Sequence, residues 1–324
     1  MKAIVQERYG PPDVLELREV DRPVAAEHEV LVRVRAASVN ARDWHTMRGD
    51  PYLARLALGV GAPKARIRGT DFAGRVEAVG PGVTGFRPGD EVFGEADGAF
   101  AEYVCASDSV VEVKPAGLSF EQAAALPLAG NTALMGLRDL GRVQPGQRVL
   151  VNGASGGVGT FAVQIAKALG AEVTGVCSTK NLDLVGSLGA DHLVDYTRED
   201  FTTTGRQYDL VFDLVGNRSL AECRRALTPV GRLVLAGGGV FEGGSAVGPI
   251  GLVLRGKLMS PFVRQRLLVL TAKPARENLA ALRELAESGR LTPVIDRTYA
   301  LSEVPDAIRY LEVEHARAKV IVTV

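Results

Sequence analysis

Cysteine is scarce in this chain, and the few cysteines lie far apart. The 324 residues include three of them, Cys105, Cys177 and Cys223, and no CxxC pair. Neither a disulfide framework nor a paired-cysteine zinc site is therefore indicated. We expect a protein of a reducing compartment, the cytoplasm.

An excess of charge of one sign and a long apolar run are also missing. Lys plus Arg equals Asp plus Glu at 38 each, which removes a general attraction to nucleic acid or to an anionic membrane. No run approaches the roughly 18 to 20 apolar residues that cross a bilayer. The first residues, MKAIVQERYG, lack the apolar stretch of a signal peptide. We expect a small-molecule substrate, no nucleic-acid partner and no membrane span.

What is present is the composition of a soluble globular protein, with 46% hydrophobic and 23% charged residues. A chain of 324 residues usually forms more than one core. Up to about residue 115, short β-type runs separated by Gly and Pro predict a mostly antiparallel, β-rich domain. Ser119 and Gln122 then form a predicted capping box before an apolar run, and we place the domain boundary there.

Beyond this boundary, strand-like and helix-like segments alternate, from RVLVN through VGTFAVQIAKALG and EVTGVC to RLVLAGGG. Such alternation predicts βαβ units and a parallel sheet. Apolar residues from Val158 to Leu169 follow a helical spacing, and Gly170 ends the predicted helix. The final run, KVIVTV, is expected to be a strand that rejoins the N-terminal domain.

The stretch GASGGVG at 153–159 joins the first of these strands to the first helix. Glycines at GxxGxxG spacing permit a tight turn and a close approach of the helix to the sheet, and bare amides at a helix start bind a diphosphate. No Lys-Ser or Lys-Thr follows, which argues against a nucleotide-hydrolase P-loop. A plain tight turn is the alternative, which the strand and helix on either side disfavour. The predicted dinucleotide contacts here are Gly153, Ser155, Gly156, Gly157, Val158 and Gly159.

The next strand, EVTGVC, ends in Ser178, Thr179 and Lys180, about 20 residues past the glycines. An NAD-selective site presents Asp or Glu there. Hydroxyls and an ammonium suit a 2′-phosphate instead, so the sequence favours NADPH. The alternative is that Lys180 is a solvated loop residue.

Motifs along almost the full length resemble the medium-chain dehydrogenase/reductase family, in its zinc-free quinone oxidoreductase or zeta-crystallin branch. They include VRAASVNARDW at 34–44, GTDFAGRVEAVGPGVTGFRPGDEVFG at 69–94, LPLAGNTAL at 126–134 and DLVGN at 213–217. The resemblance implies an α/β protein with a GroES-like β-rich catalytic domain, a doubly wound Rossmann domain with a six-stranded parallel sheet, and commonly a homodimer. We predict the catalytic domain over 1–121 plus 290–324 and the NADP-binding domain over 122–289. The segment 241–265 is interpreted as a loop and short helix near the cofactor.

The resemblance also assigns residues. It implies that Asn40 and Asp43 line the substrate cleft and that Asn131 and Thr132 lie beside the nicotinamide. Tyr196 is paired with Lys180 at the adenosine phosphate. Backbone along the ribose and nicotinamide is assigned to Val215, Gly216, Gly237 and Gly238.

Zinc-dependent relatives coordinate their catalytic metal with cysteines and a histidine. The corresponding positions here hold Asn40, Thr70 and Leu128, none of which suits Zn²⁺. We therefore predict no metal.

Without a metal Lewis acid, an acceptor that spreads the incoming charge is favoured, such as a quinone or an α,β-unsaturated carbonyl. Hydrogen-bond donors then suffice. His45 is either a proton donor or a packing histidine. Alternatives are a carrier-bound enoyl reductase, an alcohol or aldehyde dehydrogenase of the same family, and a non-catalytic NADPH-binding structural protein. The candidate donors are Asn40, Asn131, Arg48, His45 and Trp44.

Overall fold

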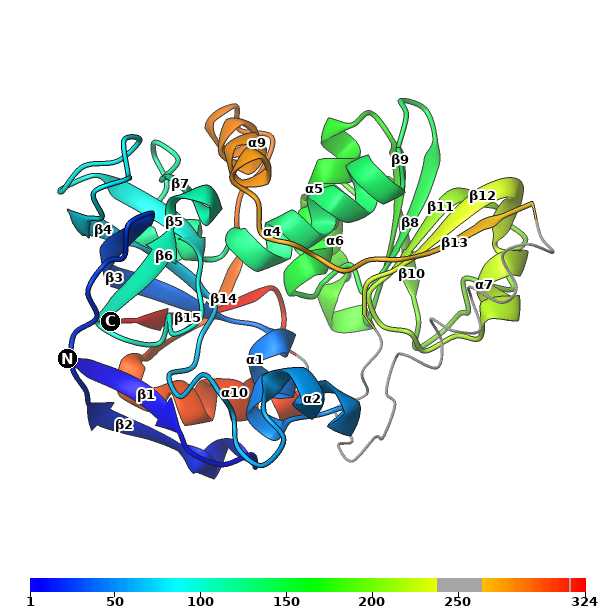
Figure 1. Cartoon of the computed structure of the whole chain (residues 1–324). Coiled ribbons are helices and arrows are strands. Elements are labelled where there is room, and N and C mark those ends of the chain that lie inside the picture. Colours follow the sequence, from blue (N-terminus) through cyan, green and yellow to red (C-terminus); the bar gives the residue numbers. More distant parts are fainter. Residues whose placement is uncertain (238–263, 315) are drawn as a thin grey trace. The chain divides into compact units, whose positions relative to one another are not determined.

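The computed structural model describes residues 1–237, 264–314 and 316–324 and divides them into two compact units (Figure 1). Unit 1 holds the described residues of 1–131 and 273–324, and unit 2 holds those of 132–237 and 264–272. Gly238 and nearly all of the loop and helix predicted over 241–265 lie outside the described residues. The functional domain limits given above stay a prediction.

Unit 1 is built on a seven-stranded sheet of order β14-β15-β3-β4-β5-β7, with β6 paired to β3, and a separate β1-β2 hairpin. All strand pairs are antiparallel except β14 with β15. The strands are β1 (Lys2–Gln6), β2 (Leu15–Glu19), β3 (Glu29–Val39), β4 (Asp71–Val79), β5 (Glu91–Glu95), β6 (Tyr103–Ser107), β7 (Val111–Val113), β14 (Ile295–Ala300) and β15 (Lys319–Thr323). The helices are α1 (Ala41–Arg48), α2 (Arg55–Leu58), α3 (Phe120–Ala124), α9 (Arg276–Glu287) and α10 (Val304–Glu314).

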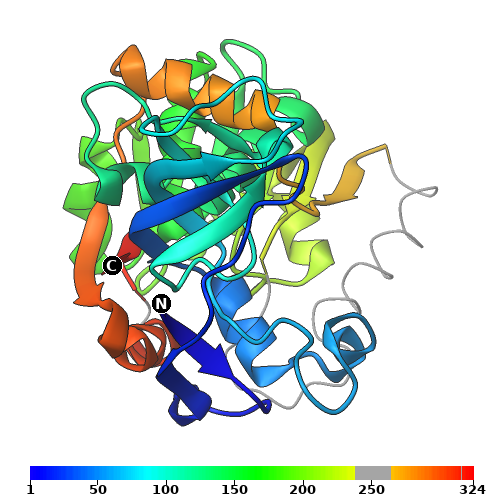
Figure 2. The ribbon, with the colours of Figure 1, turned by 60° about the vertical axis from the view of Figure 1, so that its left-hand side comes forward.

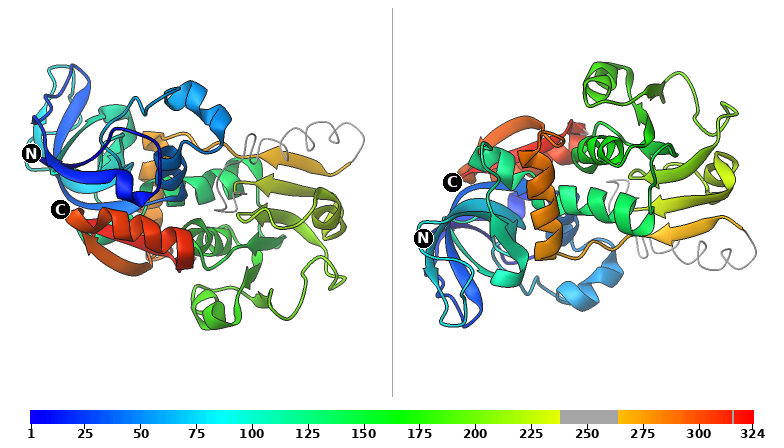
Figure 3. Two further views of the ribbon diagram at one scale, coloured as in Figure 1. Left: turned by 90° about the horizontal axis from the view of Figure 1, so that it is seen from below. Right: turned by 90° about the horizontal axis from the view of Figure 1, so that it is seen from above.

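The last strand joins the N-terminal part of the chain, as the sequence predicts. β15 pairs with β3 in a register that sets Val320 opposite Val39. Helix α10 packs on β14 and β15 (Figure 2), and α9 lies next to β7 (Figure 3). The capping box also forms, because the Gln122 amide donates to Ser119 Oγ at 3.2 Å. Since β15 brings Lys319 beside β3, residues from both ends of the chain meet in one sheet.

Unit 2 contains a six-stranded sheet of order β10-β9-β8-β11-β12-β13, in which every pair is parallel. The predicted parallel sheet is confirmed. Helix α4 (Pro127–Leu134) begins in unit 1, ends in unit 2 and continues as a π-helical segment over Met135–Leu140. The strands are β8 (Arg148–Asn152), β9 (Glu172–Cys177), β10 (His192–Asp195), β11 (Tyr208–Asp213), β12 (Leu227–Leu235) and β13 (Arg266–Val269), and the helices are α5 (Gly157–Ala168), α6 (Leu182–Ser187) and α7 (Leu220–Arg225).

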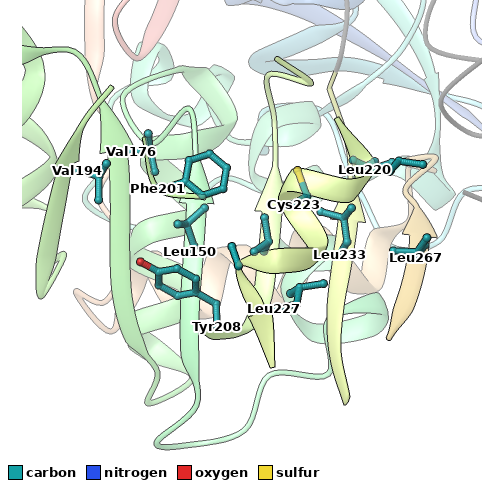
Figure 4. Packing of buried hydrophobic residues seen from close by; sticks show 13 residues of the cluster. Leu150, Val176, Val194, Phe201, Tyr208, Leu220, Cys223, Leu227, Leu233 and Leu267 are labelled. Atoms are coloured by element: carbon teal, nitrogen blue, oxygen red, sulfur yellow. The ribbon is translucent and has the colours of Figure 1, made fainter. Parts of the chain in front are cut away.

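A hydrophobic cluster fills the space between this sheet and the segments on one of its faces (Figure 4). Leu150, Val211 and Leu233 come from three neighbouring strands, and Leu220 and Cys223 come from α7. Parallel strands buried on both faces need such continuous apolar runs. The cluster fixes the sheet whose carboxyl edge carries the predicted cofactor residues.

Helix α5 is buried more completely than its apolar spacing predicts. Residues 159–166 are all buried, because the helix packs on β8 and β9 and is also covered by the π-helical segment 135–140. Gly170 follows its end with φ of 81°, as predicted. In the part of the chain that the structure describes, no helix has the length and apolarity needed to traverse a bilayer.

Candidate functional site

The glycine-rich turn of unit 2 joins the end of β8 to the start of α5. Gly153 has φ of 90°, a conformation that favours glycine. A Cβ atom on Gly159 would stand 2.1 Å from the Gly153 carbonyl oxygen, whereas one on Gly156 would meet a single protein atom, at 3.5 Å. The turn is therefore tightly closed toward the protein at Gly159 and open at Gly156.

The first turn of α5 supplies backbone donors at this place. Gly156 is the N-cap, and Gly157, Val158 and Gly159 are the first three helical residues. Amides in the first turn of a helix have no acceptor within it, and the helix dipole adds partial positive charge. Donors next to a bare glycine fit the diphosphate of a dinucleotide.

Asn181 connects this turn to the end of β9. Its amide nitrogen donates to Ser155 Oγ at 3.1 Å and to Ser178 Oγ at 3.3 Å. Asn181 itself is buried. Two hydroxyls predicted as cofactor contacts are thus held by one buried amide that sequence reasoning did not select.

Lys180 and Tyr196 follow neighbouring parallel strands, because β9 and β10 pair Cys177 with Asp195. Both side chains are exposed, and no described residue forms an ion pair or hydrogen bond with the Lys180 ammonium. The structure therefore brings the two predicted phosphate contacts to one edge of the sheet and leaves the ammonium accessible.

A carboxylate does lie near this edge, on β10 instead of β9. Asp195 accepts hydrogen bonds from Thr179 Oγ1 at 2.5 Å and from Thr197 Oγ1 at 2.7 Å. These bonds hold the pKa of Asp195 below its ordinary value, and the bond from Thr179 has the largest effect. Its oxygens are turned toward two threonines, so it orders the loops around Lys180.

The loop after β11 is fixed by Asp213, another residue that the sequence did not single out. Its Oδ1 accepts from Asn152 Nδ2 at 2.9 Å and from the backbone amides of Val215 and Gly216 at 3.1 and 2.9 Å. A Cβ on Gly237 would stand 1.9 Å from a carbonyl oxygen of this loop. Val215, Gly216 and Gly237 thus lie at the carboxyl edge of the sheet, where parallel sheets bind ligands.

Unit 1 contains a buried polar cluster where β3, β4 and β15 meet. Asp71 accepts from Ser38 Oγ and Asn40 Nδ2, both at 2.9 Å, and from the Leu128 backbone amide at 3.1 Å. Lys319 Nζ lies 3.7 Å from Asp71 Oδ2 and donates to Asn40 Oδ1 at 2.5 Å. Asp71 and Lys319 are 0% and 2% exposed, so this is a buried ion pair that needs these hydrogen bonds.

Asn40 is an internal connector of this cluster. Besides Asp71, its Nδ2 donates to the Ser38 carbonyl at 3.3 Å. Both amide hydrogens are then engaged within the protein, and Oδ1 accepts from Lys319. This geometry leaves Asn40 no free N–H for a substrate oxygen, so its predicted role as a donor lacks support.

Asp43 fixes the start of α1, a helix that the sequence did not predict. Its Oδ2 accepts from the Asn40 backbone amide at 2.8 Å, and its Oδ1 accepts from Thr70 Oγ1 at 3.3 Å. Asp43 is buried, and burial raises its pKa to about 7. The carboxyl can hold or release a proton near neutrality.

Glu95 lies directly across the β4-β5 ladder from Asp71. It is 4% exposed, and neither of its carboxyl oxygens has a hydrogen-bond partner among the described residues. Burial, reinforced by the neighbouring Asp71, raises the pKa of Glu95 to about 8. At neutral pH this side chain therefore keeps its proton.

Asn131 and Thr132, predicted to lie beside the nicotinamide, are consecutive residues of α4, and both are buried. Asn131 Nδ2 donates to the Lys273 carbonyl at 2.9 Å, and its Oδ1 accepts from Asn278 Nδ2 at 2.8 Å. Asn131 thus ties α4 to the segment that begins α9.

The other candidate donors lie on α1. His45 Nδ1 is 3.0 Å from the Asp50 carbonyl, and burial lowers the His45 pKa. Trp44 is 1% exposed, which favours a packing role over hydrogen-bond donation to a substrate. The Arg48 guanidinium pairs with Glu312 and lies 5.4 Å from the Trp44 ring, so its charge is already compensated.

A small pocket of about 70 Å³ opens beside this helix, and we call it the Arg68 pocket. Its apolar wall comes from residues between 58 and 67. Its polar lining consists of Arg42, Asp43, Thr46, Arg68, Thr70 and Asp97.

Comparison with known proteins identifies the relatives of this chain. Residues 26–116 match the family model of the alcohol dehydrogenase GroES-like domain, and residues 188–322 match that of zinc-binding dehydrogenases. The chain is 36% identical to 2-methylene-furan-3-one reductase of Solanum lycopersicum, over 99% of this chain and 79% of the relative. It is 34% identical to the chloroplastic NADPH-dependent alkenal/one oxidoreductase of Arabidopsis thaliana, with the same shares covered.

Among solved structures, the quinone oxidoreductase from Coxiella burnetii superposes with a TM-score of 0.86 at 33% identity, over 100% of this chain and 99% of that one. The chain belongs to the medium-chain dehydrogenase/reductase family. Its relatives place it in the quinone oxidoreductase branch, and the predicted fold class, a GroES-like domain with a Rossmann domain, is confirmed.

One of the matching family models takes its name from zinc-binding members. In this chain the three ligand positions implied by the resemblance hold Asn40, Thr70 and Leu128. Asn40 and Thr70 are engaged in hydrogen bonds to Asp71 and Asp43. Across residues 1–237, 264–314 and 316–324, no three His, Cys, Asp or Glu side chains come together as metal ligands would.

Proposed function

We propose that this chain is an NADPH-dependent oxidoreductase that transfers hydride to a quinone or an α,β-unsaturated carbonyl without a catalytic metal. The observation that carries this proposal is the glycine turn at the start of α5, open at Gly156, together with a nearby Lys180 whose ammonium has no partner among the described residues. The Arabidopsis relative is named for NADPH and for alkenal and enone acceptors.

In this proposal, unit 2 holds the cofactor. The amides of Gly157 and Val158 bind the diphosphate, as helix N-termini do. Ser178, Lys180 and Tyr196 surround the 2′-phosphate, with Lys180 as the charged partner. Val215, Gly216 and Gly237 supply backbone along the ribose and nicotinamide. When bound, NADPH supplies the hydride.

Unit 1 then has to orient the acceptor and stabilise the charge that develops on its oxygen. The ion pair of Asp71 and Lys319 positions Asn40 and the start of α1. Asp43 and the Thr70 hydroxyl, next to each other in the lining of the Arg68 pocket, can deliver a proton to a reduced acceptor. His45 can donate a proton from Nε2 only as the imidazolium, because Nδ1 carries the proton that it donates to the Asp50 carbonyl, and burial disfavours that charged form by lowering the His45 pKa.

A steady-state screen tests this function. NADPH or NADH oxidation is followed by absorbance with quinones, alkenals, enones and simple aldehydes as acceptors. We expect turnover with quinones or enones, a preference for NADPH, and full activity after dialysis against a chelator. Loss of activity on chelation would contradict the metal-free mechanism, and NADPH binding without turnover of any acceptor would favour a binding protein.

We also propose a cytoplasmic homodimer. The three cysteines are free thiols, two of them buried, which suits a reducing compartment. The dimer rests on the family resemblance, and light scattering of the purified chain tests it. A mass of one 34.3 kDa chain would contradict it.

A further inference from the structure

The Arg68 pocket contains a buried cation without a matching anion. Arg68 is 7% exposed. One of its terminal nitrogens donates to the Ala65 carbonyl, but Nε has no hydrogen-bond partner within the described part of the chain. No carboxylate of the described residues comes within 4.0 Å of the guanidinium. Buried guanidinium groups are normally paired, because an uncompensated charge in the interior is costly.

Two carboxyl groups lie near this cation, and neither neutralises it. Asp43 directs its oxygens to the Asn40 amide and the Thr70 hydroxyl, and burial raises its pKa to about 7. Asp97 is 69% exposed and pairs with Arg42 at 3.4 Å, so water screens it. Burial accordingly lowers the pKa of Arg68 in spite of both acids.

The backbone holds Arg68 firmly in this place. Its amide donates to the Ile4 carbonyl at 3.0 Å, and its carbonyl accepts from the Phe100 amide at 2.8 Å. Gly69, the next residue, has φ of 95°, and a Cβ on it would stand 2.4 Å from the Phe100 nitrogen. A guanidinium on such a fixed backbone is prearranged for a ligand.

The size and lining of the pocket restrict what this ligand is. About 70 Å³ admits a small group and not a nucleotide or a large ring system. Arg42 adds a second guanidinium at the rim, and Thr46 and Thr70 add hydroxyls. A planar anion that accepts two parallel N–H bonds matches a guanidinium best, and a carboxylate is the smallest common organic group of that kind.

We propose that the Arg68 pocket binds a carboxylate, and that the preferred acceptors of this enzyme are α,β-unsaturated carbonyls that carry one. This substrate class rests on the proposed reductase function. Binding of a carboxylate, in contrast, depends only on the pocket.

The test compares two acceptors that differ in one charge, trans-4-oxo-2-pentenoate and its methyl ester. A hydrogen-bonded ion pair of this kind changes affinity by about 10- to 100-fold. We expect the wild-type enzyme to show a KM for the acid lower than that for the ester by about that factor. Arg68→Gln should raise the KM for the acid to the level of the ester, and Arg68→Lys should restore part of the difference.

Arg66→Gln is the matched control, because Arg66 is an exposed arginine two residues away and does not line the pocket. It should leave both KM values unchanged. Calorimetric NADPH titration and a thermal melt establish that each variant is folded. Equal KM values for acid and ester in the wild type, or an equal rise for both in Arg68→Gln, would overturn the proposal.

Calorimetry with the acid alone separates the two hypotheses. If no acceptor is reduced but the acid binds to the wild type and not to Arg68→Gln, the reductase function fails and the carboxylate site stands. If the ester is reduced while the acid shows no Arg68-dependent binding, the function stands and the site fails.

Discussion

Replacement of Glu95 by glutamine tests the buried cluster of unit 1 through its dependence on pH. Neither carboxyl oxygen meets the geometric limits of a hydrogen bond with the described residues, and the carboxyl stands opposite Asp71 on the next strand. Burial in the fold therefore favours the neutral form of the wild-type side chain over the ionised form. Glutamine has nearly the same shape and cannot ionise.

The expected magnitude follows from the raised pKa. A change from 4.5 to about 8 corresponds to on the order of 5 kcal/mol, at about 1.4 kcal/mol per unit. The unfolded chain releases this proton above pH 4.5, whereas the folded chain keeps it up to about pH 8. Because the folded state binds more protons in that window, wild-type stability falls as pH rises through it and levels off above it.

Urea unfolding between pH 5.5 and 8.5 measures this effect. Trp44 is the only tryptophan and lies in the same unit, so its fluorescence reports on the relevant transition. We expect Glu95→Gln to gain about 3 kcal/mol over wild type between these limits. Glu19→Gln, an exposed position on β2, should show no such trend. A stability difference that is flat across this range would refute the neutral state of Glu95.

Further predictions concern the cofactor turn and the ion pair. Lys180→Ala should raise the KM for NADPH while barely changing that for NADH, and equal effects in steady-state kinetics would refute the phosphate contact. Gly156→Ala should weaken NADPH binding in calorimetry with an unchanged melting temperature, because its Cβ would make only ordinary contact with one protein atom and would occupy the space proposed for the diphosphate. Gly159→Ala should lower the melting temperature as well, since its Cβ would collide with backbone, and equal melting temperatures of the two variants would contradict this. Lys319→Met should cost about 3 to 5 kcal/mol in urea unfolding by leaving Asp71 unpaired, and a loss below about 1 kcal/mol would argue against the buried pair.

Local patterns in the sequence were enough to predict the glycine turn, the parallel sheet and the return of the last strand. Each depends on spacing along one short segment, such as the glycines between RVLVN and the helix that follows. The substrate side was harder to predict. Lys319 and Asn40 are hydrogen-bonded across 279 positions of sequence, and a lysine within KVIVTV gives no sign of its partner.

The same limit explains the other residues that were missed. Glu95 is set opposite Asp71 by strand register, and Arg68 lacks a carboxylate partner among the described residues because of what surrounds it in space. Asn181 and Asp213 order loops through side-chain bonds to distant strands or turns. The extra burial of α5 arises because the π-helical segment packs against it, and the apolar spacing within α5 does not predict that contact.

Transfer of a labelled hydride is the most direct measurement of metal-free reduction by NADPH. The enzyme is incubated with NADPH deuterated at the transferable position of the nicotinamide and with an α,β-unsaturated ketone. Mass spectrometry and NMR then locate the label in the product. We expect one deuterium at the carbon β to the carbonyl, for enzyme treated with chelator as for untreated enzyme. A reduced product without deuterium, or no reduction of quinone or enone by NADPH, would contradict it.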